Sequence, residues 1–354
     1  MSILFSPLTL KNITLKNRLV VSPMCQYSAT DGFANNWHLV HLGQFATGGA
    51  AAVIQEATAV TPVGRISAGD LGIWKDEHIE KLKEITRFIK ENQAIPGIQL
   101  AHAGRKASTG KPWLNHYQIA HDQQGGWHTI APSALAFRPD KEVPPLSMAI
   151  DDIKETIIDF QRAAKRAVTA GYDIIEIHAA HGYLIHQFLS PLSNLRTDQY
   201  GGSFENRIRF LCEIVDAIKE ELTTQSLWVR ISATDWAAGG WDQQQSVQLV
   251  EVLKTNGIEV IDVSSGGAVL HQEIKAERDY QLPFAESIKQ KTGVLTATVG
   301  LIKEAEHAEQ ILQDHKADLI MIARAFLKDP HLPFHFAEAL GAHIDWPPQY
   351  ERAK

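Results

Sequence analysis

Short apolar runs and longer amphipathic stretches take turns along the whole chain. The apolar runs predict strands, and stretches with apolar positions three or four residues apart predict helices. The predicted strands are Leu19–Ser22, Ala51–Glu56, Gly97–Ala101, Ile174–His178, Leu227–Ser232, Val260–Ser264, Leu295–Thr298 and Leu319–Ile322. The predicted helices are Val40–Gly48, Ile79–Gln93, Asp151–Ala170, Phe204–Thr223, Gln243–Asn256, Pro283–Lys291, Lys303–His315 and Pro333–Leu340. Because strands and helices alternate strictly, we expect parallel strands and an α/β fold, a (β/α)8 TIM barrel.

Two segments lie outside this regular alternation. Residues 6–17, with a repeated Thr-Leu-Lys-Asn, predict a β-hairpin that closes the bottom of the barrel. Residues 102–150 follow the third strand as a long excursion, which we expect to cap the catalytic face. A doubly wound sheet is the alternative fold, but no glycine-rich turn follows the first strand. With no visible linker, residues 1–354 are expected to form a single domain.

Charge and cysteine content narrow the range of functions. The chain has 34 Lys and Arg against 41 Asp and Glu, a net charge of −7 without a basic run, which argues against nucleic acid as the main partner. No apolar stretch approaches the roughly 20 residues needed to cross a bilayer, so no membrane association is expected. With two cysteines and no secretion signal in residues 1–7, we expect a cytoplasmic location.

The segment 174–184 carries the strongest chemical signal. Strand alternation turns Glu176 and His178 toward the barrel interior, and His181 and Tyr183 follow in the loop. Side chains at the carboxyl end of a barrel strand commonly belong to an active site. Three interpretations of the histidines are open: hydrogen-bond donors to a developing oxyanion, zinc ligands together with Glu176, or satisfied core residues. Their position at the strand end disfavours the last.

Other strand ends predict a site for an anionic, flat ligand. Gly300 follows the seventh strand and Arg324 follows the eighth, where barrels often bind a phosphate group. Parity also places Arg230 and Gln99 inside the barrel. A buried guanidinium needs an anion or several acceptors, and a heterocycle with carbonyls and ring nitrogens would satisfy both side chains.

At this point the chain resembles the Old Yellow Enzyme family of flavin-dependent ene-reductases, most of all its thermophilic-like branch with the xenobiotic reductases. The resemblance covers nearly the whole chain. It is carried by Asn17-Arg18, Ser22-Pro23-Met24-Cys25-Gln26-Tyr27, Glu56-Ala57-Thr58, Gly64-Arg65-Ile66, Gln99-Leu100-Ala101-His102-Ala103-Gly104-Arg105-Lys106, the segment 178–184, and Arg196-Thr197-Asp198-Gln199-Tyr200-Gly201-Gly202-Ser203.

The resemblance implies a barrel domain that binds FMN non-covalently and takes electrons from NADPH or NADH. The FMN-binding residues that it implies are Pro23, Met24, Cys25, Ala57, Gln99, Arg230, Gly300, Ala323 and Arg324. Arg230 would stabilise negative charge on the reduced flavin. Many relatives have Gly-Arg where this chain has Ala323-Arg324, a small departure because the backbone N–H remains.

The resemblance also implies which residues contact the substrate. His178 and His181 would hydrogen-bond the carbonyl or nitro oxygen of an activated alkene, and Tyr183 would give a proton to the α-carbon in a ping-pong reaction. Cys25 and Tyr27 match substrate-side residues. Arg352 matches an arginine that reaches a neighbouring subunit's site, which implies a homodimer or homotetramer. The long segment 105–132 would shape the pocket.

Four other classes of protein compete with this interpretation. A metal-dependent barrel lyase or hydrolase would use Glu176, His178 and His181 as ligands. A tRNA-modifying flavoprotein is disfavoured by the acidic charge balance. A dienoyl-CoA reductase needs a cysteine cluster for iron–sulfur, which two cysteines do not supply. A flavin-storage protein has no need of the histidine pair and tyrosine.

Overall fold

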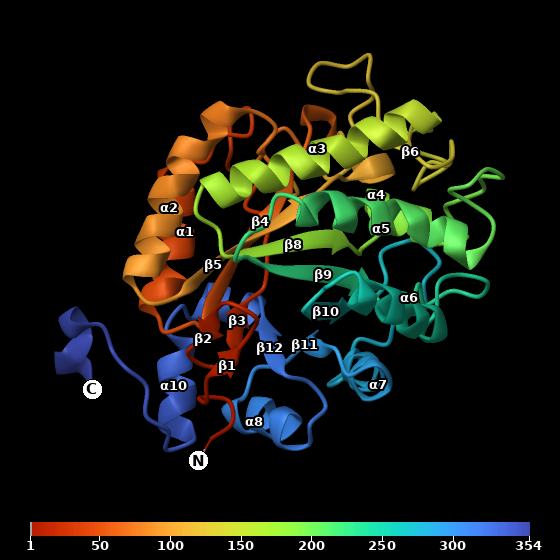
Figure 1. The fold of residues 1–354 in the computed structure, drawn as a ribbon. Coiled ribbons are helices and arrows are strands. Elements are labelled where there is room, and N and C mark those ends of the chain that lie inside the picture. The colour runs from red at the N-terminus through yellow and green to blue at the C-terminus, as the bar shows by residue number, and fades with distance from the viewer. Residues whose placement is uncertain (1) are drawn as a thin grey trace.

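Eight parallel strands close into a barrel in the computed structural model, which describes residues 2–354 (Figure 1). The strands are β3 Leu19–Val21, β4 Ala52–Ala59, β5 Ile95–Ala101, β8 Ile174–Ala179, β9 Ser226–Ser232, β10 Val260–Ser264, β11 Leu295–Val299 and β12 Leu319–Ile322. Each pairs with the next along the chain, and β12 pairs with β3 to close the ring. The predicted TIM barrel is therefore confirmed, with every predicted strand present.

Helices cover the outside of the barrel, as Figure 1 shows. They are α1 Asn36–Thr47, α2 Ile79–Glu91, α3 Ile150–Thr169, α4 Leu184–Leu189, α5 Phe204–Lys219, α6 Gln243–Thr255, α7 Leu282–Thr292, α8 Ala305–Gln313, α9 Arg324–Lys328 and α10 Leu332–Ala339. The short helices α4 and α9 were not predicted, because five or six residues are too few to show a period. Helix α1 begins four residues earlier than predicted, since Asn35 caps the backbone N–H of Trp37 at 2.9 Å.

Both predicted excursions are present in the structure. The hairpin consists of β1 Leu8–Thr9 and β2 Thr14–Leu15. The capping excursion 102–150 contains a 3-10 turn, Gly104–Lys106, and a small parallel pair, β6 Ile130–Ala131 and β7 Leu146–Ser147, which was not predicted. Two-residue strands leave no alternating pattern to read.

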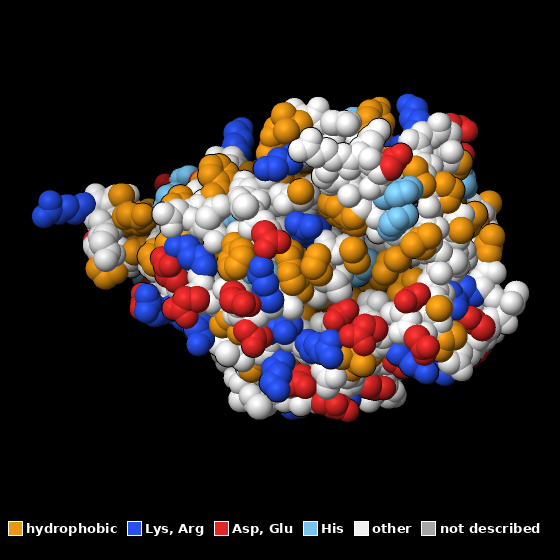
Figure 2. Space-filling model, turned by 90° about the horizontal axis from the view of Figure 1, so that it is seen from above, with side chains coloured by type: hydrophobic (Ala, Val, Ile, Leu, Met, Phe, Trp, Pro, Cys, Tyr) orange, Lys and Arg blue, Asp and Glu red, His pale blue; other side chains and the backbone are white. Residues whose placement is uncertain are grey.

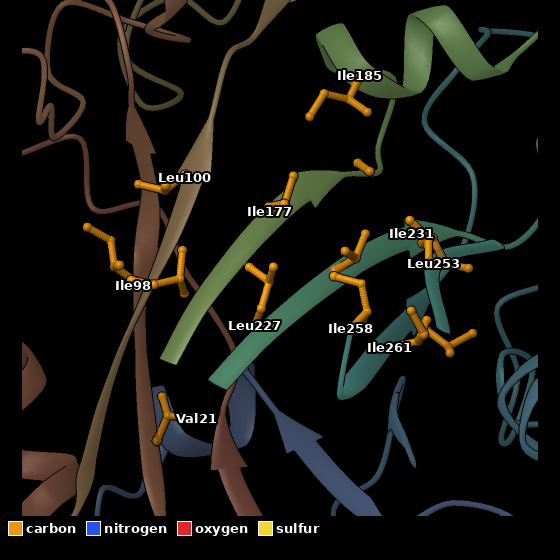
Figure 3. Close-up of a cluster of buried hydrophobic side chains, with 14 of the residues drawn as sticks. Val21, Ile98, Leu100, Ile177, Ile185, Leu227, Ile231, Leu253, Ile258 and Ile261 are labelled. Atoms are coloured by element: carbon orange, nitrogen blue, oxygen red, sulfur yellow. The ribbon is translucent and has the colours of Figure 1, made fainter. Parts of the chain in front are cut away.

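The apolar core has two parts. The larger part lies between the strands and the helices, and Figure 3 shows side chains of it that include Ile98, Ile177 and Ile261 on strands and Ile185 on α4. The smaller part fills the bottom of the barrel interior, where Leu15 of the hairpin meets Ile174 and Trp228. The hairpin therefore closes the barrel bottom with its own apolar side chain.

The C-terminal segment projects from the barrel at the left of Figures 1 and 2. Trp346 stacks on Phe334 of α10 with 4.2 Å between ring centroids, and the chain then ends in a 3-10 helix, Pro348–Ala353. Figure 2 shows acidic and basic side chains interspersed mainly over the lower half of the view, with hydrophobic and uncharged atoms predominant above them. Within residues 2–354, no helix has both the length and the apolar character needed to cross a membrane.

Candidate active site

The polar residues predicted at strand ends converge in the upper half of the barrel interior. Gln99 on β5 is the register partner of Glu176 on β8, and His178 on β8 is the partner of Arg230 on β9. All four side chains are buried. Because the strands are parallel neighbours, their carboxyl ends bring these side chains to the same edge, as the alternation predicted.

The two histidines and the tyrosine form one aromatic cluster. The His178 ring lies 5.2 Å from the His181 ring and 5.0 Å from the Tyr183 ring, centroid to centroid, and meets both edge to face. His181 and Gly182 form a turn with φ angles of 58° and 72°, a left-handed conformation that is rare for a histidine. This turn aims His181 back toward His178, and Tyr183 follows as the residue before α4.

Burial sets the protonation of the cluster. It lowers the pKa of His178 and of His181 well below the usual range, with the nearby Arg230 charge acting in the same direction. Burial also raises the pKa of Tyr183 well above its usual value. At neutral pH both imidazoles are uncharged and the phenol keeps its proton. Such a set of groups donates hydrogen bonds and a proton without carrying charge.

Hydrogen bonds hold the turn backbone on both sides. The N–H of His181 donates to Ser232 Oγ at 2.9 Å, and its carbonyl oxygen accepts from Lys106 Nζ at 2.7 Å. Lys106 is partly buried, and loss of contact with water lowers its pKa to about 7. Its Nζ lies 5.1 Å from the Tyr183 ring centroid. Lys106 was not predicted as a site residue, although the Gly104-Arg105-Lys106 motif contains it.

A buried acid pair lies beside Arg230. Arg230 Nε is 3.2 Å from Asp262 Oδ2, and Asp262 is in hydrogen-bonding contact with Glu176. Glu176 Oε1 also accepts from Gln99 Nε2 at 2.7 Å. Burial and the Asp262 carboxylate raise the pKa of Glu176 to about 8. The anion beside Arg230 in the structure is thus Asp262, a residue that the alternation Val260, Asp262, Ser264 places inside but that was not predicted as a partner.

The predicted phosphate end is a cavity of about 210 Å³. Its walls include Arg230, Gly300, Lys303, Ala323 and Arg324, so three cations face one space. Gly300 has φ 128°, and a Cβ there would come within 2.9 Å of the Tyr280 ring and the Gln281 amide. This cavity fits an anionic group placed between the last two strand ends.

Cys25, Tyr27 and Ala57 line the site from the first two strands. The Cys25 thiol contacts the Tyr27 hydroxyl, and burial raises the pKa of both groups. Tyr27 has φ 51°, and Glu56 holds this loop because its Oε2 accepts the Gln26 N–H at 2.8 Å. A bulge in β4 between Gln55 and Ala57 sets Ala57 opposite Gln99. Glu56 belongs to the motif Glu56-Ala57-Thr58, but no role was predicted for it.

The substrate-side cavity lies under the capping excursion. It has a volume of about 130 Å³, and its walls include Tyr27, Lys106, His116, Arg138 and Tyr183. A larger groove of about 790 Å³ runs along α2 on the outside of the barrel. That groove is lined by alternating Lys and Glu side chains and contains none of the predicted site residues. The smaller cavity is therefore the one that predicted site residues, Tyr27 and Tyr183, line.

Two predicted features do not join this cluster. Glu176 turns to Gln99 and Asp262, so it does not form a ligand set with the histidines, and residues 2–354 contain no group of three or more His, Cys, Asp or Glu side chains placed to hold a metal. Arg352 is exposed in the projecting C-terminal segment, away from the site of its own chain.

A closed barrel with a cationic cavity between its last two strand ends and a neutral histidine pair beside it is the arrangement expected of a flavin-dependent barrel oxidoreductase. The sequence profile described as "NADH:flavin oxidoreductase / NADH oxidase family" matches residues 3–342. The chain belongs to this family, the Old Yellow Enzyme family. It is an oxidoreductase that uses FMN as cofactor and NADH or NADPH as electron donor.

Known relatives agree with this assignment. An NADPH dehydrogenase of Geobacillus sp. (strain WCH70) is 47% identical over 353 residues, 99% of this chain and 98% of the relative. The solved structure of morphinone reductase superimposes with a TM-score of 0.81 at 28% identity, covering 98% of this chain and 92% of that one. A 2-naphthoyl-CoA reductase in complex with 2-naphthoyl-CoA gives a TM-score of 0.85 at 25% identity over 96% of this chain, which spans only 52% of that longer protein.

Proposed function

We propose that this oxidoreductase reduces the C=C bond of α,β-unsaturated carbonyl compounds such as enones and maleimides, and that it also accepts nitro compounds. The observation that carries the proposal is the cluster of two uncharged histidines and a protonated tyrosine in one buried site. An enone needs hydrogen-bond donors at its oxygen and one proton at its α-carbon, and this cluster offers both.

His178 and His181 are the proposed donors to the substrate oxygen. Within the described residues His178 makes no side-chain hydrogen bond, so its ring N–H is available. His181 Nε2 lies 2.8 Å from Ser264 Oγ. Gln281 Oε1 already accepts from Ser265 Oγ at 2.7 Å, and it is farther from Ser264 Oγ at 3.2 Å. The single hydroxyl proton of Ser264 can go either to Gln281 Oε1 or to His181 Nε2, and the shorter contact favours Nε2. A bond from Ser264 to Nε2 leaves the proton of His181 on Nδ1 for the substrate.

Tyr183 is the proposed proton donor. Its phenol is protonated at neutral pH, and it lines the substrate-side cavity. The reaction needs one hydride at the β-carbon and one proton at the α-carbon. Lys106 Nζ faces the Tyr183 ring, and its pKa of about 7 means that it is charged in part of the molecules at neutral pH. In its charged form it stabilises the negative charge that develops when the phenol gives up its proton.

Bound FMN would supply the hydride-transfer chemistry between NAD(P)H and the alkene, in two successive half-reactions. We assign Arg324 and Gly300 to its phosphate end, together with Ala323, because they line the cationic cavity. Gln99 and Arg230 would contact its ring, and Pro23, Met24, Cys25 and Ala57 would line its other edge. The strand ends that carry these residues support this assignment.

The capping excursion and the C-terminus complete the proposal. We propose that the whole chain is one FMN-binding domain with 102–150 as its cap, that Cys25 and Tyr27 contact the substrate, and that Arg352 reaches the site of a second copy in a homodimer or homotetramer. The exposed position of Arg352 on a projecting segment supports this last role. Both cysteines are free, which supports a reducing cytoplasm.

An anaerobic absorption experiment tests the proposal. The flavin absorption of the purified protein is followed while NADPH and then cyclohexenone are added. We expect bleaching with NADPH and recovery of the colour with the enone. Bleaching that no enone or maleimide reverses would contradict the alkene chemistry while leaving the family assignment intact.

The double variant His178→Ala/His181→Ala tests the site itself. We expect FMN to stay bound, because neither ring lines the phosphate cavity, and enone reduction to fall by about 10²- to 10³-fold or more. A double variant that reduces cyclohexenone at the parent rate would show that these histidines are not the oxyanion donors.

A further inference from the structure

The turn that carries His181 and Tyr183 contacts a further histidine, His186, which is fully buried. His186, in the first turn of α4, is wholly inaccessible, and its Nε2 lies 2.9 Å from Oδ1 of Asp235, which is equally buried in the loop after β9. No step of the proposed reaction uses either residue. A buried polar pair away from the reacting groups needs another explanation.

His186 bonds directly to the backbone of the turn. The N–H of Gly182 donates to His186 Nδ1 at 2.9 Å. Because Nδ1 accepts this bond, a ring proton has to lie on Nε2, which faces Asp235. Gly182 stands between His181 and Tyr183 in the chain, so this bond fixes the peptide that joins the oxyanion donor to the proton donor.

Asp235 is held as a negatively charged acceptor. Burial alone would raise its pKa, but contact with His186, the Ser190 hydroxyl and the backbone N–H of Trp241 outweighs burial, and the pKa lies below its usual value. The Trp241 N–H donates to Asp235 Oδ2 at 2.8 Å. With Oδ2 occupied, Oδ1 is the oxygen left to face His186 and keep the ring in its orientation.

The opposite side of the turn is blocked by the loop after β10. A Cβ added to Gly182 would lie 2.0 Å from the carbonyl oxygen of Gly267, so the backbones are in close contact. The turn is thus clamped between Gly267 on one side and His186 on the other. His186 holds the N–H of the His181–Gly182 peptide, and Lys106 holds its carbonyl oxygen. Without His186 the N–H side of this peptide loses its partner, and a 1 Å displacement of reacting groups costs about 10²-fold in rate.

We propose that His186, oriented by Asp235, is a positioning residue that fixes His181 and Tyr183 for alkene reduction. The inference rests on the proposed function, because only that reaction needs both side chains in one geometry. His186 does not touch the substrate. It acts through the Gly182 peptide.

Two conservative substitutions separate the contributions of the two ring nitrogens of His186. In His186→Asn the amide oxygen takes the place of Nδ1 and keeps the acceptor for Gly182 N–H, but the side chain no longer reaches Asp235. In His186→Gln the amide takes the place of Nε2 and still reaches Asp235, but Gly182 N–H loses its partner. FMN content and the thermal midpoint of each holoenzyme establish that it is folded.

The first readout is hydrogen exchange at the peptide that contains Gly182, measured by mass spectrometry on the holoenzyme. We expect faster exchange in His186→Gln and near-parental exchange in His186→Asn. The second readout starts from dithionite-reduced enzyme and follows its oxidation by cyclohexenone, with ferricyanide as an oxidant that needs no oriented turn. We expect the enone rate to fall about 10- to 100-fold in His186→Gln, about threefold or less in His186→Asn, and the ferricyanide rate to stay unchanged in both.

Two results would overturn the positioning role. One is parental exchange and parental enone rate in His186→Gln. The other is an equal loss of rate in both variants with unchanged exchange, since the acceptor for Gly182 would then be irrelevant. Failure of the parent enzyme itself to react with any enone would count against the proposed function instead, and the hydrogen-exchange comparison would still decide whether His186 holds the turn.

Discussion

The two ends of the barrel interior are built on the same strands and have opposite chemistry. Strand β8 supplies Ile174 to the apolar cluster at the bottom and His178 to the polar cluster at the top. Strand β9 does the same with Trp228 and Arg230. The inward register is unchanged along each strand, so a few residues are enough to pass from a packed core to an active site.

The comparison shows that the two ends are stabilised in different ways. At the bottom, burial of apolar side chains contributes about 25 cal/mol per Å² removed from water. At the top, burial of Arg230, Asp262 and Glu176 is unfavourable, and only their mutual contacts offset it. The bottom therefore stabilises the fold, and the top uses part of that stability to hold charged and polar groups in fixed positions.

The largest effect is expected from Arg230→Met at the top. The substitution leaves Asp262 buried without its cation, and breaking a buried pair costs about 3–5 kcal/mol of unfolding free energy. FMN content after gel filtration should fall as well, because Arg230 lines the cationic cavity and is proposed to contact the FMN ring. Urea unfolding followed by circular dichroism measures the first effect.

The matched control is Arg87→Met on the outside of α2, where the side chain is 73% exposed. A surface ion pair contributes about 0–1 kcal/mol, so the control should keep both stability and FMN. If Arg230→Met were as stable as Arg87→Met, the acid pair would not depend on the guanidinium, and the contrast drawn between the two ends would be wrong.

The next effect is expected at the bottom. Leu15→Ala removes the hairpin side chain that closes the barrel and should cost about 2–5 kcal/mol of unfolding free energy. Affinity for FMN and the rate with cyclohexenone should stay near the parental values, because the top is intact. Leu146→Ala, at an exposed leucine of β7, is the control and should change stability little. Loss of FMN affinity in Leu15→Ala would mean that the two ends are coupled.

Most of the fold could be predicted from sequence because strands and helices differ in period. All eight barrel strands and the long helices follow from that difference, and inward parity placed Glu176, His178, Gln99 and Arg230 correctly. Short elements such as α4 and the β6–β7 pair could not be predicted, because their lengths are below one period.

Site residues that directly follow strand ends could be predicted from the sequence. Contacts between side chains on different loops could not be predicted. Lys106 reaches His181 from a segment 75 residues away, and His186 meets Asp235 across the ends of β8 and β9. No spacing along the chain indicates such contacts. The roles of Cys25, Tyr27 and Arg352 rest on resemblance alone, since nothing in their local pattern distinguishes a ligand contact from a core or surface residue.

A smaller effect at the top is expected from Ser264→Ala. Without the hydroxyl, nothing holds the His181 proton on Nδ1, so the share of the imidazole that is able to donate to the substrate falls. We expect a decrease of about 10-fold in the rate of oxidation of the reduced enzyme by cyclohexenone. Ser265→Ala is the control, because its hydroxyl bonds Gln281 and not His181. Equal rates in the two variants would contradict the proposed tautomer.

The last effect concerns the acid pair and its dependence on pH. In the folded protein the pKa of Glu176 is raised from 4.5 to about 8, so the folded state holds a proton that the unfolded chain releases. The stabilisation linked to this proton is fully present below about pH 4.5 and is lost as the pH rises toward 8. Glu176→Gln keeps the shape of the protonated acid and can still donate to Asp262, but it has no proton to lose. We therefore expect its thermal midpoint to fall less than that of the parent between pH 5 and 8, by a few degrees.

Glu251→Gln on the exposed face of α6 should follow the parent curve. If Glu176→Gln followed the parent curve too, the proton would not reside on Glu176, and the top of the barrel would carry a net charge that Arg230 alone has to balance.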